Sequence, residues 1–279
     1  MNKVRALLTA ALVFFALGEV QAGPWVRDAG DGYVKLGGAS FVGDQYYRAG
    51  VATELDSRAE SLSLYGEVGL GDGWQLVIYL PYQIATNETP GGVSYVNHTL
   101  GDARVQVDKR LTDAFPLSLS LELKAPLYQV VAEQELSGSQ EAWRTNFPDV
   151  GDGNVDLTLK LQAGASLDAI AGWASMAVGY TKRTGTYIDS LYFSAQLGSW
   201  IWPKHVNISV YTQGNLTMGT DAFPELLASR ESVSVEGTVS VMGLPASPDL
   251  CVMFSLGQVV YARYGAKGRI LSMALARSW

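Results

Sequence analysis

The stretch Asn154-Val155-Asp156-Leu157-Thr158-Leu159-Lys160-Leu161-Gln162-Ala163 places an aliphatic side chain at every second position and a polar one at nearly every position between. Successive side chains of a β-strand point to opposite faces, so this segment has one apolar face and one polar face. Such a strand is typical of a transmembrane β-barrel, whose outer wall contacts lipid and whose lumen is wet.

The same alternation recurs along the chain and predicts about twelve strands. The predicted ranges are 32–42, 59–70, 73–86, 100–111, 116–126, 153–164, 170–181, 187–198, 204–216, 231–242, 249–260 and 268–279. Bacterial barrels of this kind have an even number of antiparallel strands of about this length. The predicted fold class is therefore all-β, a single transmembrane antiparallel up-and-down β-barrel.

The connections between these strands fall into a short set and a longer set. Those after the even strands are short, from Gly71-Asp72 to Gly243–Pro248, and those after the odd strands tend to be longer and more polar. The longer ones are Val42 to Arg58, Thr86 to Thr99, Leu127 to Asp152 and Met218 to Arg230. Short turns belong to the periplasmic side of such barrels. We therefore expect both termini in the periplasm.

The first 22 residues have the features of a secretory signal peptide. Lys3 and Arg5 precede an apolar run from Ala6 to Leu17, and Val20-Gln21-Ala22 supplies a small-x-small cleavage site. The apolar run is too short to span a membrane as a helix. We expect residues 1–22 to be removed and residues 23–279 to form the barrel in the bacterial outer membrane.

Composition excludes several kinds of function. Without residues 1–22 the net charge is near −8, which disfavours nucleic acid as a partner. Cys251 is the only cysteine, and the two histidines, His98 and His205, fall in separate predicted connections. The Asp152–Asp156 segment lacks two of the expected positions of a calcium loop. We therefore expect no catalytic residues, no metal and no cofactor.

A soluble all-β sandwich would also alternate, with its polar face in water. Aromatic residues near the predicted strand ends favour the membrane barrel instead, because such residues form interfacial girdles. They are Trp74, Tyr82, Tyr180, Trp200, Trp202 and Tyr261. The last predicted strand ends on Trp279 and resembles the signal read by the outer-membrane assembly machinery, although Arg277 departs from its apolar pattern. The expected partners are therefore outer-membrane lipids and that machinery.

Several short motifs resemble one known family. They are Gly23-Pro24-Trp25, Gly32–Leu36, Ser63–Leu70, Leu80-Pro81-Tyr82, Leu100–Arg104 and Gly151–Leu157. Together they resemble the outer-membrane transporter family named for the meta-cleavage pathway of phenol degradation. The resemblance implies an outer-membrane barrel with a transport role, and it carries over neither catalytic residues nor a role in phenol metabolism.

Strand parity assigns a mixed set of charges to the lumen. The expected lumen-lining residues are Lys35, Glu67, Asp102, Arg104, Asp108, Glu122, Lys124, Asp156, Lys160 and Glu236. Mixed charges on an inner wall either form structural ion pairs or select solutes. The inward positions between them are mostly small and polar, and Tyr65, Tyr79, Tyr192 and Tyr211 also point inward. The long Leu127 to Asp152 segment is a candidate for a constriction at the barrel mouth.

The leading hypothesis is a passive channel or transporter for a small hydrophobic, aromatic or sugar-like solute. A structural or surface role, such as exopolysaccharide export or adhesion, is the alternative. An outer-membrane enzyme is a third hypothesis, and it would require a nucleophile and a base, commonly a histidine. Neither His98 nor His205 has such a context in the sequence, so we expect a protein that is not an enzyme.

Overall fold

The computed structural model describes residues 23–48, 51–88, 92, 94–128, 150–151, 153–185, 187–219, 231–244, 247–263 and 265–279. The expected signal peptide, residues 1–22, lies outside this part. So do residues 129–149, which make up most of the predicted Leu127 to Asp152 connection, and residues 220–230. No helix in the described ranges is long and apolar enough to cross a membrane.

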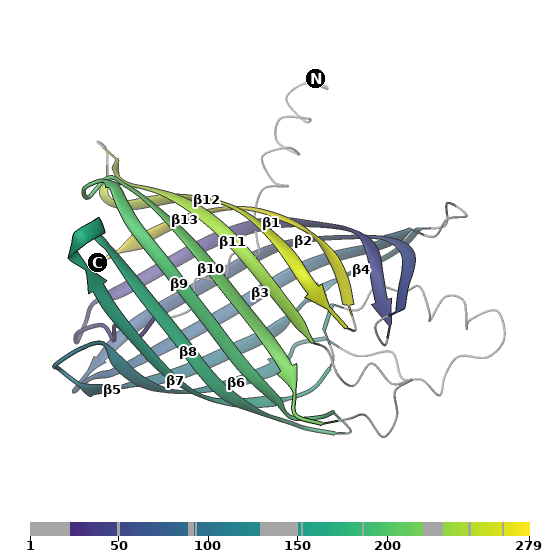
Figure 1. Cartoon of the computed structure of the whole chain (residues 1–279), viewed down its shortest axis with the longest axis horizontal. Coiled ribbons are helices and arrows are strands. Elements are labelled where there is room, and N and C mark those ends of the chain that lie inside the picture. The colour runs from purple at the N-terminus through teal and green to yellow at the C-terminus, as the bar shows by residue number, and fades with distance from the viewer. Residues whose placement is uncertain are drawn as a thin grey trace.

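The described chain is almost entirely β-structure (Figure 1). The strands are β1 (Gly32–Arg48), β2 (Val51–Gly71), β3 (Trp74–Glu88), β4 (Ser94–Leu100), β5 (Asp102–Thr112), β6 (Leu117–Pro126), β7 (Asp156–Leu167), β8 (Gly172–Arg183), β9 (Ser190–Trp202), β10 (Val206–Thr217), β11 (Ser232–Leu244), β12 (Ser247–Ala262) and β13 (Gly265–Ser278). A 3-10 turn, η2 (Asp168–Ile170), joins β7 to β8.

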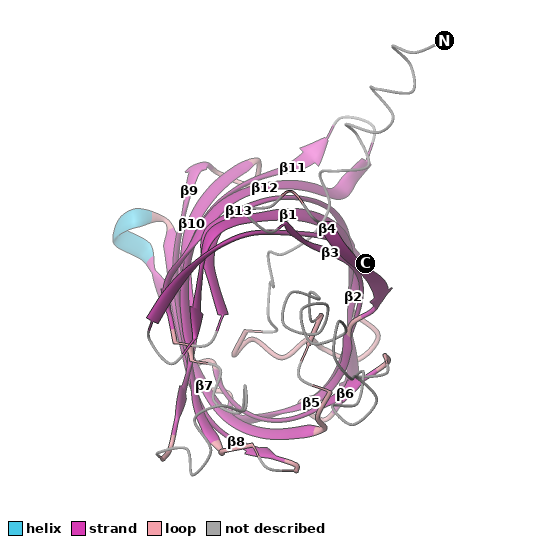
Figure 2. Ribbon diagram, turned by 90° about the vertical axis from the view of Figure 1, so that its right-hand side faces the viewer, coloured by secondary structure: helices cyan, strands magenta, loops and turns pink. Residues whose placement is uncertain are grey.

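These strands form a closed antiparallel barrel, as the alternation predicts. Apart from β4 and β5, each strand pairs with its neighbours in sequence, and β1 closes the ring by pairing with β13 on one side and β2 on the other. Both β4 and β5 pair with β3 and are separated only by Gly101, so together they occupy one position in the wall. The barrel therefore has twelve wall positions. Figure 2 shows the ring of strands seen from one end.

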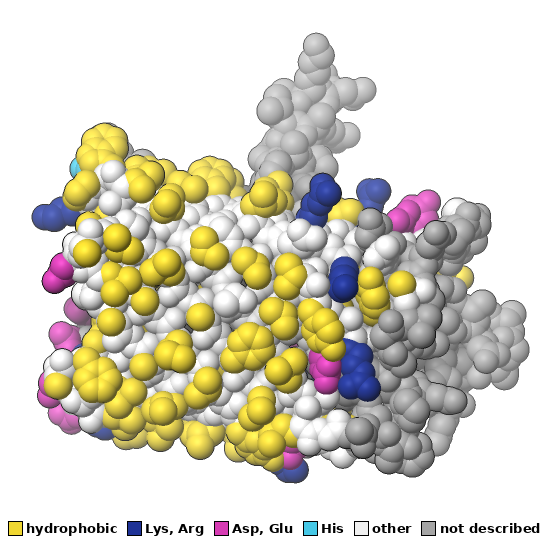
Figure 3. All heavy atoms as spheres, in the orientation of Figure 1, with side chains coloured by type: hydrophobic (Ala, Val, Ile, Leu, Met, Phe, Trp, Pro, Cys, Tyr) yellow, Lys and Arg dark blue, Asp and Glu magenta, His cyan; other side chains and the backbone are white. Residues whose placement is uncertain are grey.

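The two faces of the wall differ as strand parity predicts. Leu119 and Leu121 are exposed on the outer face, whereas Ser118 and Ser120, which alternate with them, are completely buried. Figure 3 shows hydrophobic side chains spread over the strands, with charged side chains gathered towards the two ends of the barrel. The outer surface is thus an apolar band of the kind that contacts hydrocarbon.

Two of the predicted long connections are wrong. The Val42 to Arg58 segment is mostly strand, because β1 runs to Arg48 and β2 starts at Val51. The Thr86 to Thr99 segment contains the end of β3 and most of β4. Both are strand extensions near one end of the barrel. Polar residues pair as strands there without an apolar face, so alternation gives no signal.

The ends of the chain's barrel region meet at the same end of the ring. Gly32 and Trp279 exchange two backbone hydrogen bonds, with N···O distances of 3.0 and 3.1 Å. The tight turn at Asp72 and Gly73 and the turn at 203–205 lie at this same end, because the strands are antiparallel. Which side of the membrane this end faces stays a prediction, and we refer to it as the short-turn end.

The β1–β13 seam offers a test of ring closure. A Cβ atom at Gly268 would lie 2.3 Å from the carbonyl oxygen of Val42 on the neighbouring strand, so the pairing must shift. We expect Gly268→Ala to lower the free energy of unfolding by about 1–3 kcal/mol, the usual cost of overpacking. Urea unfolding in lipid vesicles, followed by tryptophan fluorescence, measures it.

Gly237→Ala is the matched control, because its Cβ would have no neighbour nearer than 3.9 Å. Equal stability of the two variants would contradict the close packing of this seam.

Candidate functional site

Seven of the ten predicted lumen residues lie together on three neighbouring strands. They are Asp102, Arg104 and Asp108 on β5, Glu122 and Lys124 on β6, and Asp156 and Lys160 on β7. The strand register places them in successive levels along the inner wall, because Asp108 pairs with Ser120, which pairs with Lys160. We call this side of the interior, β5 to β8, the charged wall.

Lys160 is at the centre of the charged wall. Its Nζ lies 2.7 Å from a carboxylate oxygen of Glu122 and donates a hydrogen bond of 2.9 Å to Gln106 Oε1. It also lies 5.1 Å from the ring centre of Tyr192 on β9. Lys160 is only 2 % exposed, so its ammonium group depends on these partners for the stabilisation that water would otherwise give.

Asp108 is held next to this group by amides. Gln75 and Gln106 each donate a side-chain hydrogen bond to its carboxylate, at 3.1 and 2.7 Å. Neither Asp108 nor Gln75 has any exposed surface. The charged wall at this level is therefore a packed polar core whose side chains hold one another in place.

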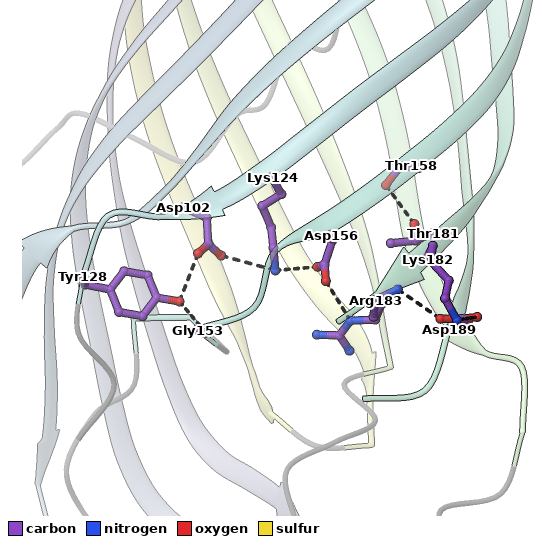
Figure 4. A network of polar contacts seen from close by, with 10 residues as sticks. All are labelled: Asp102, Lys124, Tyr128, Gly153, Asp156, Thr158, Thr181, Lys182, Arg183 and Asp189. Carbon is purple, nitrogen blue, oxygen red and sulfur yellow. Dashed lines mark hydrogen bonds and ion pairs between the residues drawn. The ribbon is translucent and has the colours of Figure 1, made fainter. Parts of the chain in front are cut away.

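A second network lies at the end of the charged wall that is farther from the short-turn end (Figure 4). Lys124 Nζ lies 2.6 Å from Asp156 and 3.6 Å from Asp102, and Arg183 on β8 lies 3.4 Å from the same Asp156. Cations and acids alternate along this chain of contacts. The four side chains together carry no net charge.

Tyr128 extends the second network to the chain that follows β6. Its hydroxyl donates a 3.0 Å hydrogen bond to Asp102 and accepts one of 2.9 Å from the backbone N–H of Gly153 (Figure 4). Tyr128 and Gly153 stand at the two ends of the predicted Leu127 to Asp152 connection. The wall thus holds both ends of that connection at one point.

Lys35 and Glu67 lie on β1 and β2, around Tyr65. Glu67 accepts a hydrogen bond of 2.5 Å from the Tyr65 hydroxyl and lies 2.6 Å from the guanidinium of Arg27. Lys35 Nζ lies 5.3 Å from the ring centre of Tyr65. The two predicted residues therefore share one buried aromatic neighbour.

The last two predicted residues, Arg104 and Glu236, lie on β5 and β11. Arg104 lies over the ring of Tyr79, 5.8 Å from its centre. Glu236 on β11 is partly buried, and Thr238 donates a 3.4 Å hydrogen bond to it. By strand parity, Glu236 and Asp249 are the inward charged residues that the structure describes on β9 to β13, and Asp249 lies at the short-turn end of β12.

The side of the interior opposite the charged wall, β9 to β13, has few charged residues, Glu236 and, near the start of β12, Asp249. Many of its inward side chains are small, hydroxyl-bearing or apolar, and the amides Gln196, Asn207 and Gln213 also face inward. The small, hydroxyl-bearing and apolar ones include Ser194, Ser209, Ser234, Thr238, Ser255, Gly257, Ser272, Ala274 and Ala276. Tyr33, Tyr65, Val77, Cys251 and Ala276 form one apolar cluster where this side meets β1, β2 and β3, and Ala39 and Ile270 form another at its border with β1. We call this side, β9 to β13, the uncharged wall, and Lys35 on the neighbouring strand β1 lies outside it.

Residues Gly23 to Arg27 lie against the inner wall near the short-turn end, and Asp28 to Asp31, which follow them, are exposed at that end. The backbone N–H of Arg27 donates to the inward-facing Gln75 on β3, at 2.8 Å, and Arg110 on β5 donates to the carbonyl of Val26, at 2.5 Å. Farther on, Gly164 on β7 faces Pro24, and a Cβ there would lie 2.6 Å from the proline ring. This N-terminal segment therefore runs along the inner wall from β2 to β7 and occupies part of the interior.

Sequence reasoning missed Arg27, Gln75, Gln106 and Arg183 as members of these networks. The neutral amides carry no charge signal, and Arg27 precedes the first strand. The sequence did carry a signal that the N-terminal segment lies close to the wall, since a glycine inside a strand often marks a place where another backbone comes near. Gly69 is such a residue, and the carbonyl of Gly69 accepts a hydrogen bond from Gly30.

Asp189, in the connection between β8 and β9, has a strongly shifted pKa. Hydrogen bonds from the backbone N–H of Arg183, from Tyr180 and from Lys182 stabilise its charged form and lower its pKa to about 2. A lowered pKa means that these contacts are complete above the ordinary value of about 3.9 and are lost as the pH falls through about 2. Carboxyl NMR shifts in detergent micelles should show this titration, and a midpoint near 4 would contradict it.

The structure gives no support to the enzyme hypothesis. His98 was expected in a loop but lies in β4, where its ring is 3.4 Å from the exposed Tyr82 hydroxyl. His205, expected beside the turn before β10, lies in that turn and packs on Trp202. Within the described ranges, no three His, Cys, Asp or Glu side chains are grouped to hold a metal.

Comparison with known proteins shows the fold and no family. No protein-family model matches the chain, and no curated protein matches it. The chain is similar in structure to an outer-membrane channel of Pseudomonas putida F1, with a TM-score of 0.67 and 14 % identity over 95 % of this chain and 99 % of that one. The resemblance to the phenol-pathway family is therefore not confirmed at the level of sequence.

Two further structures share the architecture. One is the translocator domain of the autotransporter NalP from Neisseria meningitidis, with a TM-score of 0.54 and 8 % identity over 100 % of this chain and 94 % of that one. The other is the CymD monoaromatic hydrocarbon channel, with a TM-score of 0.50 and 8 % identity over 91 % of this chain and 89 % of that one. The likeness supports an outer-membrane barrel fold.

Proposed function

We propose that the chain is an outer-membrane channel for a small solute that is hydrophobic or partly aromatic, and that it is not an enzyme. The observation that carries the proposal is the two-sided interior. The charged wall is packed with ion pairs that satisfy one another, whereas the uncharged wall presents small side chains and apolar clusters. A solute with few polar groups loses the least hydration free energy when it passes along the uncharged wall.

The similar barrels support this proposal. Two of them are described as channels, and one of these is a monoaromatic hydrocarbon channel. The tyrosines on the inner face would provide aromatic surface for such a solute. A sugar-like solute would instead need hydrogen-bonding groups left open by the wall.

The proposed role of the ten predicted residues follows from their contacts. Lys160, Glu122 and their neighbours hold the charged wall rigid and close to neutral, so that it shapes the passage without strongly selecting for ions. Glu236 is the charged group nearest to the path along the uncharged wall.

A pair of tryptophan substitutions tests the path. Thr238 faces the interior, and the next residue, Val239, is exposed on the outer face. We expect Thr238→Trp to reduce the swelling rate of liposomes in arabinose several-fold, because the ring fills the passage. Val239→Trp adds the same ring on the lipid side and should swell at the wild-type rate.

Substrate class is tested with the same proteins. Benzyl alcohol should interrupt the single-channel current of the wild type more often than glucose does at equal concentration. Equal effects of the two solutes would contradict the preference for an aromatic solute, and equal swelling of the two tryptophan variants would contradict the path.

A further inference from the structure

The apolar band on the outer surface is unusually short on β13. Its outward side chains are Leu271, Met273 and Leu275, and the exposed Arg269 and Arg277 stand at either end of this run. Residues 269 and 277 are separated by about 26 Å along a strand. At the usual strand tilt this is about 20 Å of height, less than the roughly 25 Å of a typical apolar band.

Strand β7 carries a longer band. On β7 the outward positions from Leu157 to Ala165 are all apolar, and Val155 extends the run before the strand begins. The band on β13 is therefore shorter than that on β7, and it lies at the seam where the first and last strands of the ring pair.

A second exposed arginine stands at the same level as Arg269. Arg269 pairs with Val42 on β1. Counting along the two antiparallel strands from the Gly32–Val68 pair places Val42 opposite Arg58 on β2, to within one residue. Both arginine side chains are exposed on the outer face, with the strand β1 between them. Two strand spacings separate them by about 10 Å. On the other side, Arg269 pairs with the exposed Gln258 of β12.

The charges around the two arginines of this patch have both signs, and Glu88 on β3 pairs with Asp56, two residues from Arg58. Lys267 lies two residues beyond Arg269, over the ring of Tyr47, and Asp56 and Glu60 flank Arg58 on its own strand. Arginines that face hydrocarbon are costly, so their heads require an anionic partner at the edge of the band. A lipid phosphate is the group that lies at this depth and matches guanidinium geometry.

We propose that Arg58 and Arg269 bind the two phosphates of a bisphosphorylated glycolipid, lipid A, at the barrel seam. The headgroup of this lipid then lies closer to the centre of the membrane than the headgroups around it. The choice of lipid A rests on the expected orientation, in which the end of the barrel opposite the short turns faces the outer leaflet. The spacing of the arginines suits two phosphates on one headgroup. The site holds the seam at a fixed depth in a locally thinned leaflet.

The test is native mass spectrometry of the full-length barrel in mild detergent with added diphosphoryl lipid A. We expect the double variant Arg58→Gln/Arg269→Gln to retain about tenfold less lipid A than the wild type. Lys182→Gln is the matched control, because Lys182 is an exposed cation at the same end of the barrel, on β8. It should retain lipid A as the wild type does. Heat-modifiable gel migration confirms that each variant is folded.

Three results would overturn the proposal. The first is equal retention by the double variant and the control. The second is equal retention of phosphatidylglycerol and lipid A by the wild type, which would remove the assignment to the outer-leaflet glycolipid. The third is a dimer that the double variant abolishes, since the patch would then contact a second copy of the chain. None of these measurements involves solute passage, so their failure is distinct from failure of the proposed channel.

Discussion

Gly69→Ala is expected to increase the single-channel conductance by about twofold or more, because it displaces a segment that occupies the interior. A Cβ atom at Gly69 would lie 1.9 Å from the carbonyl oxygen of Asp28 and 2.7 Å from that of Arg27. Both contacts are with backbone, which cannot rotate away as a side chain can. The N-terminal segment must therefore leave its position against β2.

The displaced segment should also become accessible. Arg27 lies beside Glu67 in the wild type, and its backbone is hydrogen-bonded to Gln75, so trypsin should cleave after it slowly. In Gly69→Ala the same bond should be cleaved rapidly, as mass spectrometry of digested vesicles would show.

Gly66→Ala is the control on the same strand, because its Cβ would have no neighbour nearer than 3.8 Å. It should leave both conductance and cleavage unchanged. Unchanged conductance in Gly69→Ala, with the segment cleaved, would show that residues 23–31 do not narrow the passage.

Lys160→Met is expected to destabilise the barrel by about 3–5 kcal/mol, the usual cost of removing one member of a buried ion pair. The substitution leaves the Glu122 carboxylate without its 2.7 Å partner and leaves Gln106 without its donor. Urea unfolding in lipid vesicles, followed by tryptophan fluorescence, measures the loss.

A double variant separates the charge from the packing. Lys160→Met/Glu122→Gln removes the uncompensated carboxylate, so it should recover most of the stability lost in the single variant. Lys182→Met is the control, because its pair with Asp189 is on the surface and contributes less than about 1 kcal/mol. A single variant as stable as this control would mean that the charged wall is not a packed core.

The barrel itself could be predicted from the sequence because lipid imposes a strict rule on the outer face. Leu119 and Leu121 must be apolar if they contact hydrocarbon, so the alternation is clean wherever a strand crosses the membrane. The rule ends where the membrane ends. The predicted loop from Val42 to Arg58 was wrong for this reason, since its polar residues extend β1 and β2 outside the apolar band.

The inner wall was predictable in position but not in pairing. Parity indicates that Lys160 and Glu122 face inward, yet their contact depends on the register of β6 against β7. Strand register is set by the whole ring and by turn geometry, and single segments do not encode it. The N-terminal segment was missed because residues 23–31 have no strand period, and their place inside the barrel depends on glycines far along the chain.

Single-channel recording of the folded, full-length protein in a planar bilayer tests the central claim most directly. We expect discrete current steps in the wild type, smaller steps in Thr238→Trp and steps of wild-type size in Val239→Trp. A protein that shows heat-modifiable migration, and is therefore folded, but that gives no current steps in any of the three forms would contradict this claim.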